Sequence, residues 1–187
     1  MAFKDYFKDF QSLTVNDSIV LRQVEIESDF DDYYDIYSND EVFKLYGGGR
    51  GISDKSGVMK ALQNQVKEFE NARVYSWTIV DVKNAKAIGR ILLSDFQAHN
   101  KIANIGYFIN QTYWRKGVAS ECVSAVTKFG FDCLKLERIF THVAVDNVGS
   151  WRVLEKNGFI REGLLRHCFE LKDSLVDCYM YSRLSTD

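Results

Sequence analysis

The sequence has 187 residues, of which 46% are hydrophobic and 14% aromatic, enough for one globular domain that buries roughly 70% of its unfolded surface. With 24 basic and 26 acidic residues the formal net charge is -2, which gives no basis for direct, nonspecific binding to nucleic acid. No apolar run approaches the roughly 20 residues of a membrane span, and the N-terminus is charged every few residues. We therefore expect a soluble, cytoplasmic protein without a signal peptide or membrane contact.

The first half of the chain predicts a packed N-terminal segment, a strand, two helices and a hairpin, from apolar residues that recur at helical or strand spacing. Glycines between the two helices indicate a flexible connection at Tyr46–Gly51. The predicted elements are residues 1–17 as an arm or short helix, strand Ser18–Val24, helix Ser28–Ser38 capped by Ser28 or Asp29, helix Ser53–Asn71 capped by Ser53, and hairpin strands Arg73–Asp81 and Ala87–Ser94.

The second half predicts a parallel crossover followed by an antiparallel hairpin. A strand, a long helix and a second strand in succession imply a right-handed crossover between parallel strands. The predicted elements are strand Ile102–Ile109, helix Val118–Cys133, strand Arg138–Val145, helix Asp146–Asn157 closed by Gly158, and hairpin strands Phe159–Cys168 and Leu175–Leu184.

The junction between the first of these strands and the long helix carries the strongest local chemical signal. Free amides of the first helical turn, the helix dipole and the basic Arg115 and Lys116 converge there, and Gly117 allows close approach of backbone to a ligand. The pattern suits a pyrophosphate, although an ordinary strand-to-helix turn with solvated basic side chains has the same local features. It matches neither a Walker loop nor a dinucleotide fingerprint.

Two blocks of the sequence resemble the GNAT superfamily of N-acetyltransferases. The first is WRKGVA, in which Gly117 and Ala119 fill the last fixed positions of the acetyl-CoA signature, while Trp114 replaces its usual Gln or Arg. The second is DNVGSWRVLEKNGFIREGLLR, Asp146 to Arg166, which resembles the RimJ/RimL branch of ribosomal-protein N-acetyltransferases. The resemblance covers roughly residues 85 to 184.

This resemblance implies an α/β fold with a mixed, mostly antiparallel seven-stranded sheet, splayed between its fourth and fifth strands, and about four main helices. All 187 residues then form a single GNAT-like domain. It also implies acetyl-CoA as cosubstrate. The residues expected to bind it are Tyr107, Phe108 and Ile109 on the fourth strand, Trp114, Arg115, Lys116, Gly117, Val118, Ala119 and Ser120 at the junction, and Asn147 on the short helix.

The same resemblance assigns the catalytic groups. Many members protonate the departing thiolate with a tyrosine that corresponds to Leu154 here, so that group is absent, and the RimJ/RimL pattern offers Ser150 instead. Helix capping alone would also explain Asn147 and Ser150. The candidate general base is Glu170, but ungapped alignment places Phe169 at its position, and a shift of one residue reverses the face of a strand.

Acceptor contacts are expected from Tyr33, Tyr34, Tyr46 and Arg50, which border the acceptor groove of the resembled family. The preferred acceptor is the N-terminal α-amine of a protein, with ribosomal proteins among the candidates. A polyamine or aminoglycoside-like small amine, and an inactive acetyl-CoA sensor, are the alternatives. A homodimer is left open.

The cysteines and histidines give no metal pattern. Cys122, Cys133, Cys168 and Cys178 show no paired spacing and are expected to be buried thiols rather than disulfides or zinc ligands. The three histidines lie far apart in the sequence, and His142 is expected to be structural. We therefore predict no metal site.

Overall fold

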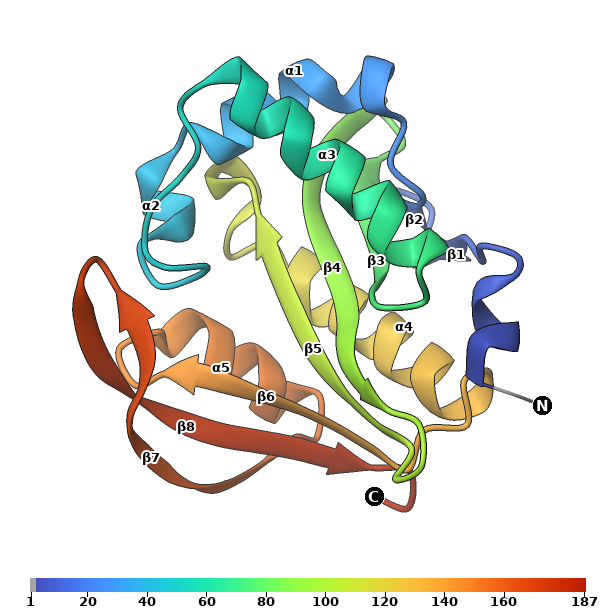
Figure 1. The fold of residues 1–187 in the computed structure, drawn as a ribbon, viewed down its shortest axis with the longest axis vertical. Helices are drawn as coiled ribbons and strands as arrows, with labels where there is room; N and C mark the ends of the chain where they lie inside the picture. Colours follow the sequence, from blue (N-terminus) through green and yellow to red (C-terminus); the bar gives the residue numbers. More distant parts are fainter. Residues whose placement is uncertain (1–2) are drawn as a thin grey trace.

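All the segments that the sequence predicts to be strands form strands in a computed structural model, which describes residues 3–187. These strands join in one sheet (Figure 1). Residues 1 and 2 of the predicted arm, and the side chain of Phe3, lie outside the described part. The strands are β1 (Leu13–Thr14), β2 (Ile19–Arg22), β3 (Tyr75–Asp81), β4 (Lys86–Gln97), β5 (Ile102–Ile109), β6 (Arg138–Ala144), β7 (Ile160–Leu171) and β8 (Ser174–Leu184).

The sheet has eight strands in the order β1-β2-β3-β4-β5-β6-β8-β7, and every neighbouring pair is antiparallel except β5 and β6. The seven-strand prediction is therefore one short, because the two-residue β1 was part of the predicted arm. The helices are η1 (Phe3–Phe7), α1 (Ile26–Tyr37), α2 (Asp40–Phe43), α3 (Lys55–Glu70), η2 (Gln111–Tyr113), α4 (Val118–Asp132) and α5 (Val148–Lys156). The short α2 was not predicted.

Two helix caps differ from the predictions. The first helix begins at Ile26 after Glu25, and Asp29 lies inside it, 2% exposed, where it accepts hydrogen bonds from Arg22 at 2.6 and 2.8 Å. Asp29 lies within the helix because its carboxylate pairs there with the guanidinium of Arg22 on β2. At the start of α3 the cap is Asp54 rather than Ser53, and Asp54 accepts from the Gly57 amide.

The helices cover the two faces of the sheet and make two separate cores. Helix α4 buries Cys122, Val126 and Phe129 against one face, in a cluster that includes the fully buried Trp77. Helices α1, α2 and α3 bury a second cluster on the opposite face, around Tyr37. Figure 1 shows α1 and α3 on one side of β3 to β5 and α4 on the other.

The sheet opens between β5 and β6, as predicted. These strands pair only over Ile102–Asn104 and Arg138–Phe140, whereas β5 continues to Ile109 and β6 to Ala144. In Figure 1 they meet near the bottom and diverge toward the left. The sheet therefore divides into two wings, one of β1 to β5 and one of β6 to β8, and these enclose a wedge-shaped opening.

The cysteine prediction is half wrong. All four thiols are free, but only Cys122 and Cys178 are buried, whereas Cys133 and Cys168 are exposed. Cys133 follows the last residue of α4, and Cys168 lies in an irregular stretch of β7. At both places the regular spacing of apolar residues no longer predicts which side chains are buried. Burial raises the pKa of the Cys122 thiol to about 12, so this thiol is unreactive at neutral pH.

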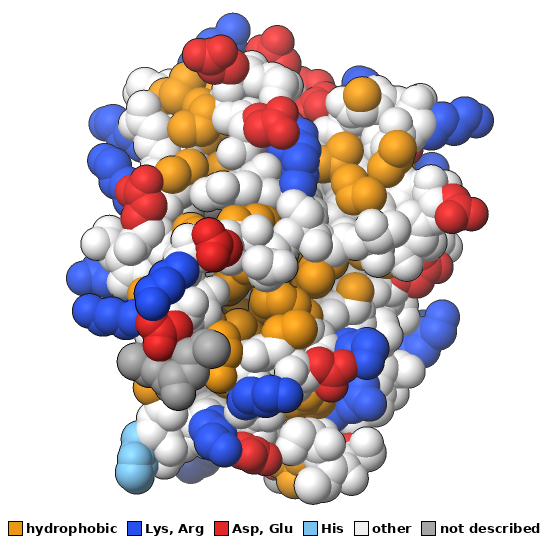
Figure 2. All heavy atoms as spheres, turned by 90° about the vertical axis from the view of Figure 1, so that its right-hand side faces the viewer, with side chains coloured by type: hydrophobic (Ala, Val, Ile, Leu, Met, Phe, Trp, Pro, Cys, Tyr) orange, Lys and Arg blue, Asp and Glu red, His pale blue; other side chains and the backbone are white. Residues whose placement is uncertain are grey.

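The surface mixes charges of both signs. Figure 2 shows basic and acidic side chains interspersed on one face, with hydrophobic side chains gathered between them. None of the helices described is both long and apolar enough to cross a bilayer. Within residues 3–187 there is also no group of three His, Cys, Asp or Glu side chains suited to a metal ion.

A charged cluster links the three strands β6, β8 and β7, in addition to their main-chain pairing. Arg138 on β6 forms a bidentate ion pair with Glu162 on β7, and Ser182 on the intervening β8 donates to Glu162 at 2.7 Å. These hydrogen bonds lower the pKa of Glu162 from 4.5 to about 2. The cluster thus crosses three strands and fixes their alignment below the opening.

The lowered pKa predicts how acid affects stability. Glu162 stabilises the fold fully above its unfolded pKa of about 4.5, and this contribution is lost as the pH falls toward about 2. Thermal melts from pH 7 to pH 2.5 should therefore show a flatter acid decline for Glu162→Gln than for the wild type. Glu170→Gln, on the same strand but without an ion pair among the described residues, serves as control. Parallel acid profiles for Glu162→Gln and the wild type would contradict this assignment.

Candidate active site

A groove of about 1150 Å³ occupies the opening between β5 and β6. Its walls come from β4, β5 and β6, from the loop after α2, and from the N-terminal ends of α4 and α5. The groove brings together most of the predicted cosubstrate residues, from Tyr107 on β5 to Asn147 at the start of α5. The predicted site residues that line it are Tyr46, Tyr107, Phe108, Ile109, Trp114, Arg115, Gly117, Val118, Ala119, Ser120, Asn147 and Ser150.

The start of α4 leaves several amides without partners. Gly117 is the N-cap with a φ of 86°, a left-handed conformation that favours glycine, and Arg115 before it has a φ of 60°. The first intrahelical bond runs from Glu121 to the Gly117 carbonyl. Within residues 3–187 the amides of 115–120 donate no hydrogen bond, and a Cβ on Gly117 would contact only Glu121, at 3.6 Å. This end of the groove therefore presents donors at the positive end of a helix.

The two basic residues of the junction point in different directions. Arg115 lines the groove and forms no ion pair among the described residues. Lys116 does not line it, and its ammonium lies over the Tyr113 ring at 5.0 Å from the centroid. Only one of the two side chains thus adds positive charge to the groove wall.

The main-chain groups of β5 face the groove and β4 in turn, from one residue to the next. Asn110 donates to Ile88 on β4 at 2.7 Å, whereas the Ile109 carbonyl accepts from the Trp114 indole at 2.8 Å. Because consecutive main-chain groups alternate between the two edges of a strand, Tyr107 and Ile109 face the opening and Phe108 faces β4. The main chain of Phe108 pairs with β4 and its side chain is buried in the second core, so Phe108 has no free main-chain group with which to bind the cosubstrate, contrary to the expectation.

The N-terminal end of α5 supplies the hydroxyl of the site. Asn147 is the N-cap, and its side chain accepts from the Ser150 amide at 3.2 Å and donates to the Leu45 carbonyl at 3.4 Å. The Ser150 hydroxyl lies 3.0 Å from the hydroxyl of Tyr107, across the opening. Burial raises the pKa of Tyr107, which therefore stays protonated at neutral pH.

Glu170 does not line the groove. Strand β7 has two extra residues between Leu165 and Phe169 relative to β8, and this bulge turns the Phe169 side chain into the groove. Glu170, next in the chain, is exposed. The bulge is present but does not aim Glu170 at the site, so the predicted base is not where the chemistry would need it.

Three of the four predicted acceptor residues also lie elsewhere. Tyr33 is fully buried, with its hydroxyl bonded to Thr78 and Gly89. Tyr34 bonds the Ser53 carbonyl, and Arg50 pairs with Asp173. Tyr46 alone lines the groove, packed edge-on against Phe108.

Sequence reasoning missed several groove residues. Arg90 on β4 is nearly buried, bonds Ser76 at 2.6 Å and lies 3.6 Å from Glu68 of α3. A charged residue in the middle of an apolar strand was the signal that could have revealed it. His142, expected to be structural, is exposed and lines the groove, and partial burial lowers the pKa of its imidazole, which is then mostly neutral at pH 7.

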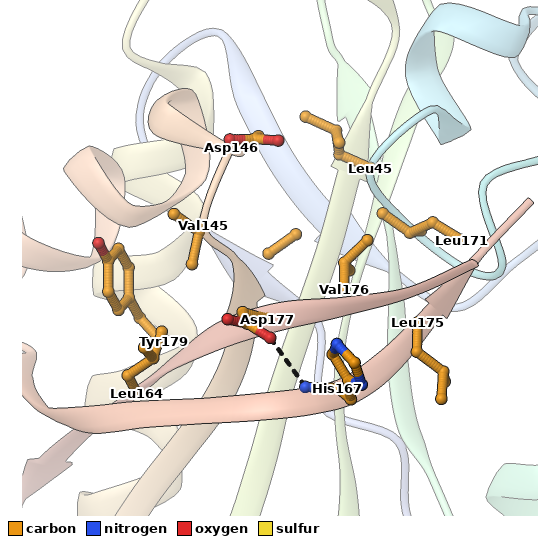
Figure 3. A pocket seen from close by; sticks show the side chains of 11 residues that line it. Leu45, Val145, Asp146, Leu164, His167, Leu171, Leu175, Val176, Asp177 and Tyr179 are labelled. Carbon is orange, nitrogen blue, oxygen red and sulfur yellow. Dashed lines mark hydrogen bonds between the residues drawn. The ribbon is translucent and has the colours of Figure 1, made fainter.

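A second cavity of about 440 Å³ adjoins the groove and shares Leu45, Ala144 and Asp146 with it. Figure 3 shows its wall of aliphatic side chains from β7 and β8, with Asp177 turned toward the main chain of His167. That amide donates to Asp177 at 2.9 Å. The groove is thus continued by a mainly apolar pocket with two carboxylates.

A bridge closes the open end of the wedge. The loop after α2, predicted to be a flexible connection, meets the tip of the β7–β8 hairpin, where the Lys172 amide donates to the Gly48 carbonyl at 3.0 Å. Gly49 has a φ of 77°, a conformation that favours glycine, and a Cβ there would lie 3.2 Å from the Lys172 amide nitrogen, a tight contact. Arg50 and Asp173 add an ion pair at the same place.

Comparison with known families identifies this arrangement. The sequence model of the acetyltransferase (GNAT) domain matches residues 18–160, which include the whole junction and the start of α5. The chain belongs to the GNAT family. Members of this family are acetyl-CoA-dependent acetyltransferases, and the groove therefore belongs to an enzyme of that class.

Individual relatives place this acetyltransferase more narrowly. It is 33% identical to the uncharacterised N-acetyltransferase YoaA of Bacillus subtilis over 89% of this chain and 93% of the relative. It is 28% identical to the ribosomal-protein-serine acetyltransferase of Escherichia coli over 71% and 73%, in keeping with the RimJ/RimL-like branch. The structure of the Microcin C7 self immunity acetyltransferase MccE with acetyl-CoA and AMP has the same fold, with a TM-score of 0.82, 21% identity and coverage of 91% and 94%.

The capping role of Asn147 predicts a measurable effect on stability. Asn147→Ala removes the acceptor for the Ser150 amide and should cost about 1 kcal/mol, or roughly 2–4 °C in melting temperature. Asn147→Asp keeps a side-chain acceptor at the cap and should melt close to the wild type. Equal losses in the two variants would contradict the cap.

Proposed function

We propose that this acetyltransferase moves the acetyl group of acetyl-CoA to the N-terminal α-amine of a protein, by direct transfer, with ribosomal proteins among the candidate acceptors. One observation carries the proposal: a single groove runs from the free amides of α4, past the Ser150 hydroxyl, to a second, mainly apolar cavity. A donor and an acceptor can then approach one hydroxyl from opposite ends.

The residues at the α4 end fit the pyrophosphate of acetyl-CoA. The unbonded amides of 115–120 and the Arg115 guanidinium offer hydrogen bonds and positive charge, and Gly117 leaves the approach to them open. The main chain of Tyr107 and Ile109 lines the path from there toward Ser150, where an extended pantetheine arm would bind as an added strand edge. The cosubstrate supplies the activated acetyl group.

Ser150 is the group that we assign to proton transfer. Acetyl transfer forms a bond between nitrogen and carbon and breaks the bond between carbon and sulfur, while the nitrogen loses one proton and the sulfur gains one. Ser150 lines the groove, its main-chain amide is held by the Asn147 cap, and its hydroxyl can donate to the sulfur as the bond breaks. Leu154, fully buried, cannot do so.

The choice of an α-amine follows from the position of Glu170, the base that the sequence predicted. Glu170 lies outside the groove, so the acceptor should arrive partly neutral. At pH 7.5 an α-amine with a pKa of about 7.8 is roughly one-third neutral, whereas a lysine with a pKa of about 10.4 is neutral in about 0.1% of molecules. The apolar second cavity supports an acceptor that extends beyond its amine, such as a peptide.

A small polyamine is the second candidate, because Glu41, Glu68 and Asp146 line the groove. Carboxylates around an acceptor site favour a cation with several charges. The two candidates differ in what the second cavity contributes, since a small amine would not reach its far wall.

Cosubstrate binding should depend on Gly117. Gly117→Val puts a β-branched residue at a φ of 86° and covers the neighbouring amides, so calorimetry should show acetyl-CoA binding weakened by about tenfold or more. Gly163→Ala, at an open position outside the groove, should bind normally. Normal binding by Gly117→Val, in a protein that melts like the wild type, would place the cosubstrate elsewhere.

The acceptor can be tested with matched peptides. A peptide with a free N-terminus should react faster than the same peptide with a blocked N-terminus and a lysine, measured by release of CoA. Its rate should rise with pH and level off near the α-amine pKa of about 7.8. Spermidine and an aminoglycoside are run alongside, and turnover confined to them would exclude the protein acceptor but keep the enzyme.

A further inference from the structure

The hydroxyl of Tyr107 on β5 reaches across the opening to the proposed catalytic residue. The Tyr107 hydroxyl donates to the Ser150 carbonyl at 3.2 Å, and its oxygen also lies 3.0 Å from the Ser150 hydroxyl, a contact in which either oxygen can be the donor. The contact joins β5 to α5 beyond Asn104, the last residue of β5 that pairs with β6. The phenol therefore touches Ser150 at the point where the wings of the sheet have already parted.

The hydrogen-bonding capacity of the pair is limited. Each hydroxyl carries one proton and can accept further hydrogen bonds. The half-buried phenol keeps its proton at neutral pH, since burial raises the pKa of Tyr107. When the single phenol proton is shared between the carbonyl oxygen and the hydroxyl oxygen of Ser150, as a three-centre hydrogen bond, the Ser150 proton is left free for a third group in the groove.

We propose that Tyr107 is a positioning residue whose hydroxyl donates to Ser150 and directs the serine proton into the groove, toward the departing sulfur. This inference rests on the proposed role of Ser150. It goes beyond that role, because it assigns a function to the Tyr107 side chain and not to the main chain of β5.

The proton balance involves Ser150 and leaves Tyr107 unchanged. As the bond between carbon and sulfur breaks, its electron pair stays on sulfur, which takes a proton from the serine hydroxyl. The proton that the attacking nitrogen releases restores that hydroxyl. Tyr107 keeps its own proton throughout and acts by orienting and polarising Ser150.

The sequence of α5 is consistent with a tyrosine on β5 that supports Ser150. Leu154, one helical turn after Ser150, occupies the position at which many members of the family carry a tyrosine. The Leu154 side chain is fully buried in the core. A tyrosine hydroxyl is therefore still present beside α5, but it comes from β5. Asn147 fixes the Ser150 amide from the other side, so the serine is held at two points.

A double-mutant cycle tests the proposal. Tyr107→Phe removes one oxygen and should lower kcat by roughly tenfold while changing the KM for acetyl-CoA by less than about twofold. Ser150→Ala should lower kcat by about 10²-fold or more. In the Ser150→Ala background, Tyr107→Phe should have no further effect on kcat, because its target is gone.

Tyr181→Phe is the matched control. Tyr181 is fully buried and its hydroxyl donates to Glu155 on the same helix at 2.8 Å, but Tyr181 does not line the groove. This variant should lower the melting temperature at least as much as Tyr107→Phe does and leave kcat near that of the wild type. A loss of kcat in Tyr181→Phe equal to that in Tyr107→Phe would assign the effect to displacement of α5 and overturn the proposal.

The remaining outcomes separate the inference from the function on which it rests. If Tyr107→Phe lowers kcat by the same factor with and without Ser150, Tyr107 does not act through the serine and the proposal fails alone. If Ser150→Ala leaves kcat unchanged, the proposed role of Ser150 fails and the positioning role fails with it. A rise in the KM for acetyl-CoA without a fall in kcat would make Tyr107 a binding residue instead.

Discussion

The early parting of β5 and β6 is the constraint on which the rest of the structure depends. After three paired residues on each strand, the facing edges have main-chain donors and acceptors with no partner strand. Such groups are costly to leave unpaired when buried, so the protein must either satisfy them or keep them accessible. Both solutions occur here. The Trp114 indole donates a hydrogen bond to the Ile109 carbonyl at the end of β5, and the rest of this edge lines a groove that a ligand can enter.

The divergence persists because each strand is held firmly on its other edge. Strand β5 pairs with β4 along its length, and β6 pairs with β8 from Arg138 to Ala144. The two helices that cover the opening begin at it: α4 at Gly117 and α5 at Asn147. The N-terminal ends of α4 and α5 therefore direct free amides and Ser150 toward the same groove. The parting of β5 and β6 thus creates the candidate active site.

Sequence patterns predicted the fold, and they predicted which residues gather at the α4 end of the groove, because both depend on local signals. Strand and helix periods, Gly117 at a turn, and Asn147 with Ser150 in a first turn are features of neighbouring residues. The acceptor end depends on nonlocal geometry. The face of Glu170 was decided by a bulge upstream in β7, and the burial of Tyr33 by a hydroxyl partner 45 residues away. Arg90 on β4 pairs with Glu68 on α3, a contact between distant elements that residue spacing does not reveal.

The bridge between the loop after α2 and the β7–β8 tip changes the topology of the opening. Strands β5 and β6 meet at Asn104 and Phe140, and the Gly48–Lys172 hydrogen bond ties their two wings together at the far end. The backbone therefore closes a ring around the wedge, and the contact between Tyr107 and Ser150 spans it. Under the proposed function, a peptide acceptor would enter this ring by its free end, whereas the middle of a chain would meet the bridge first.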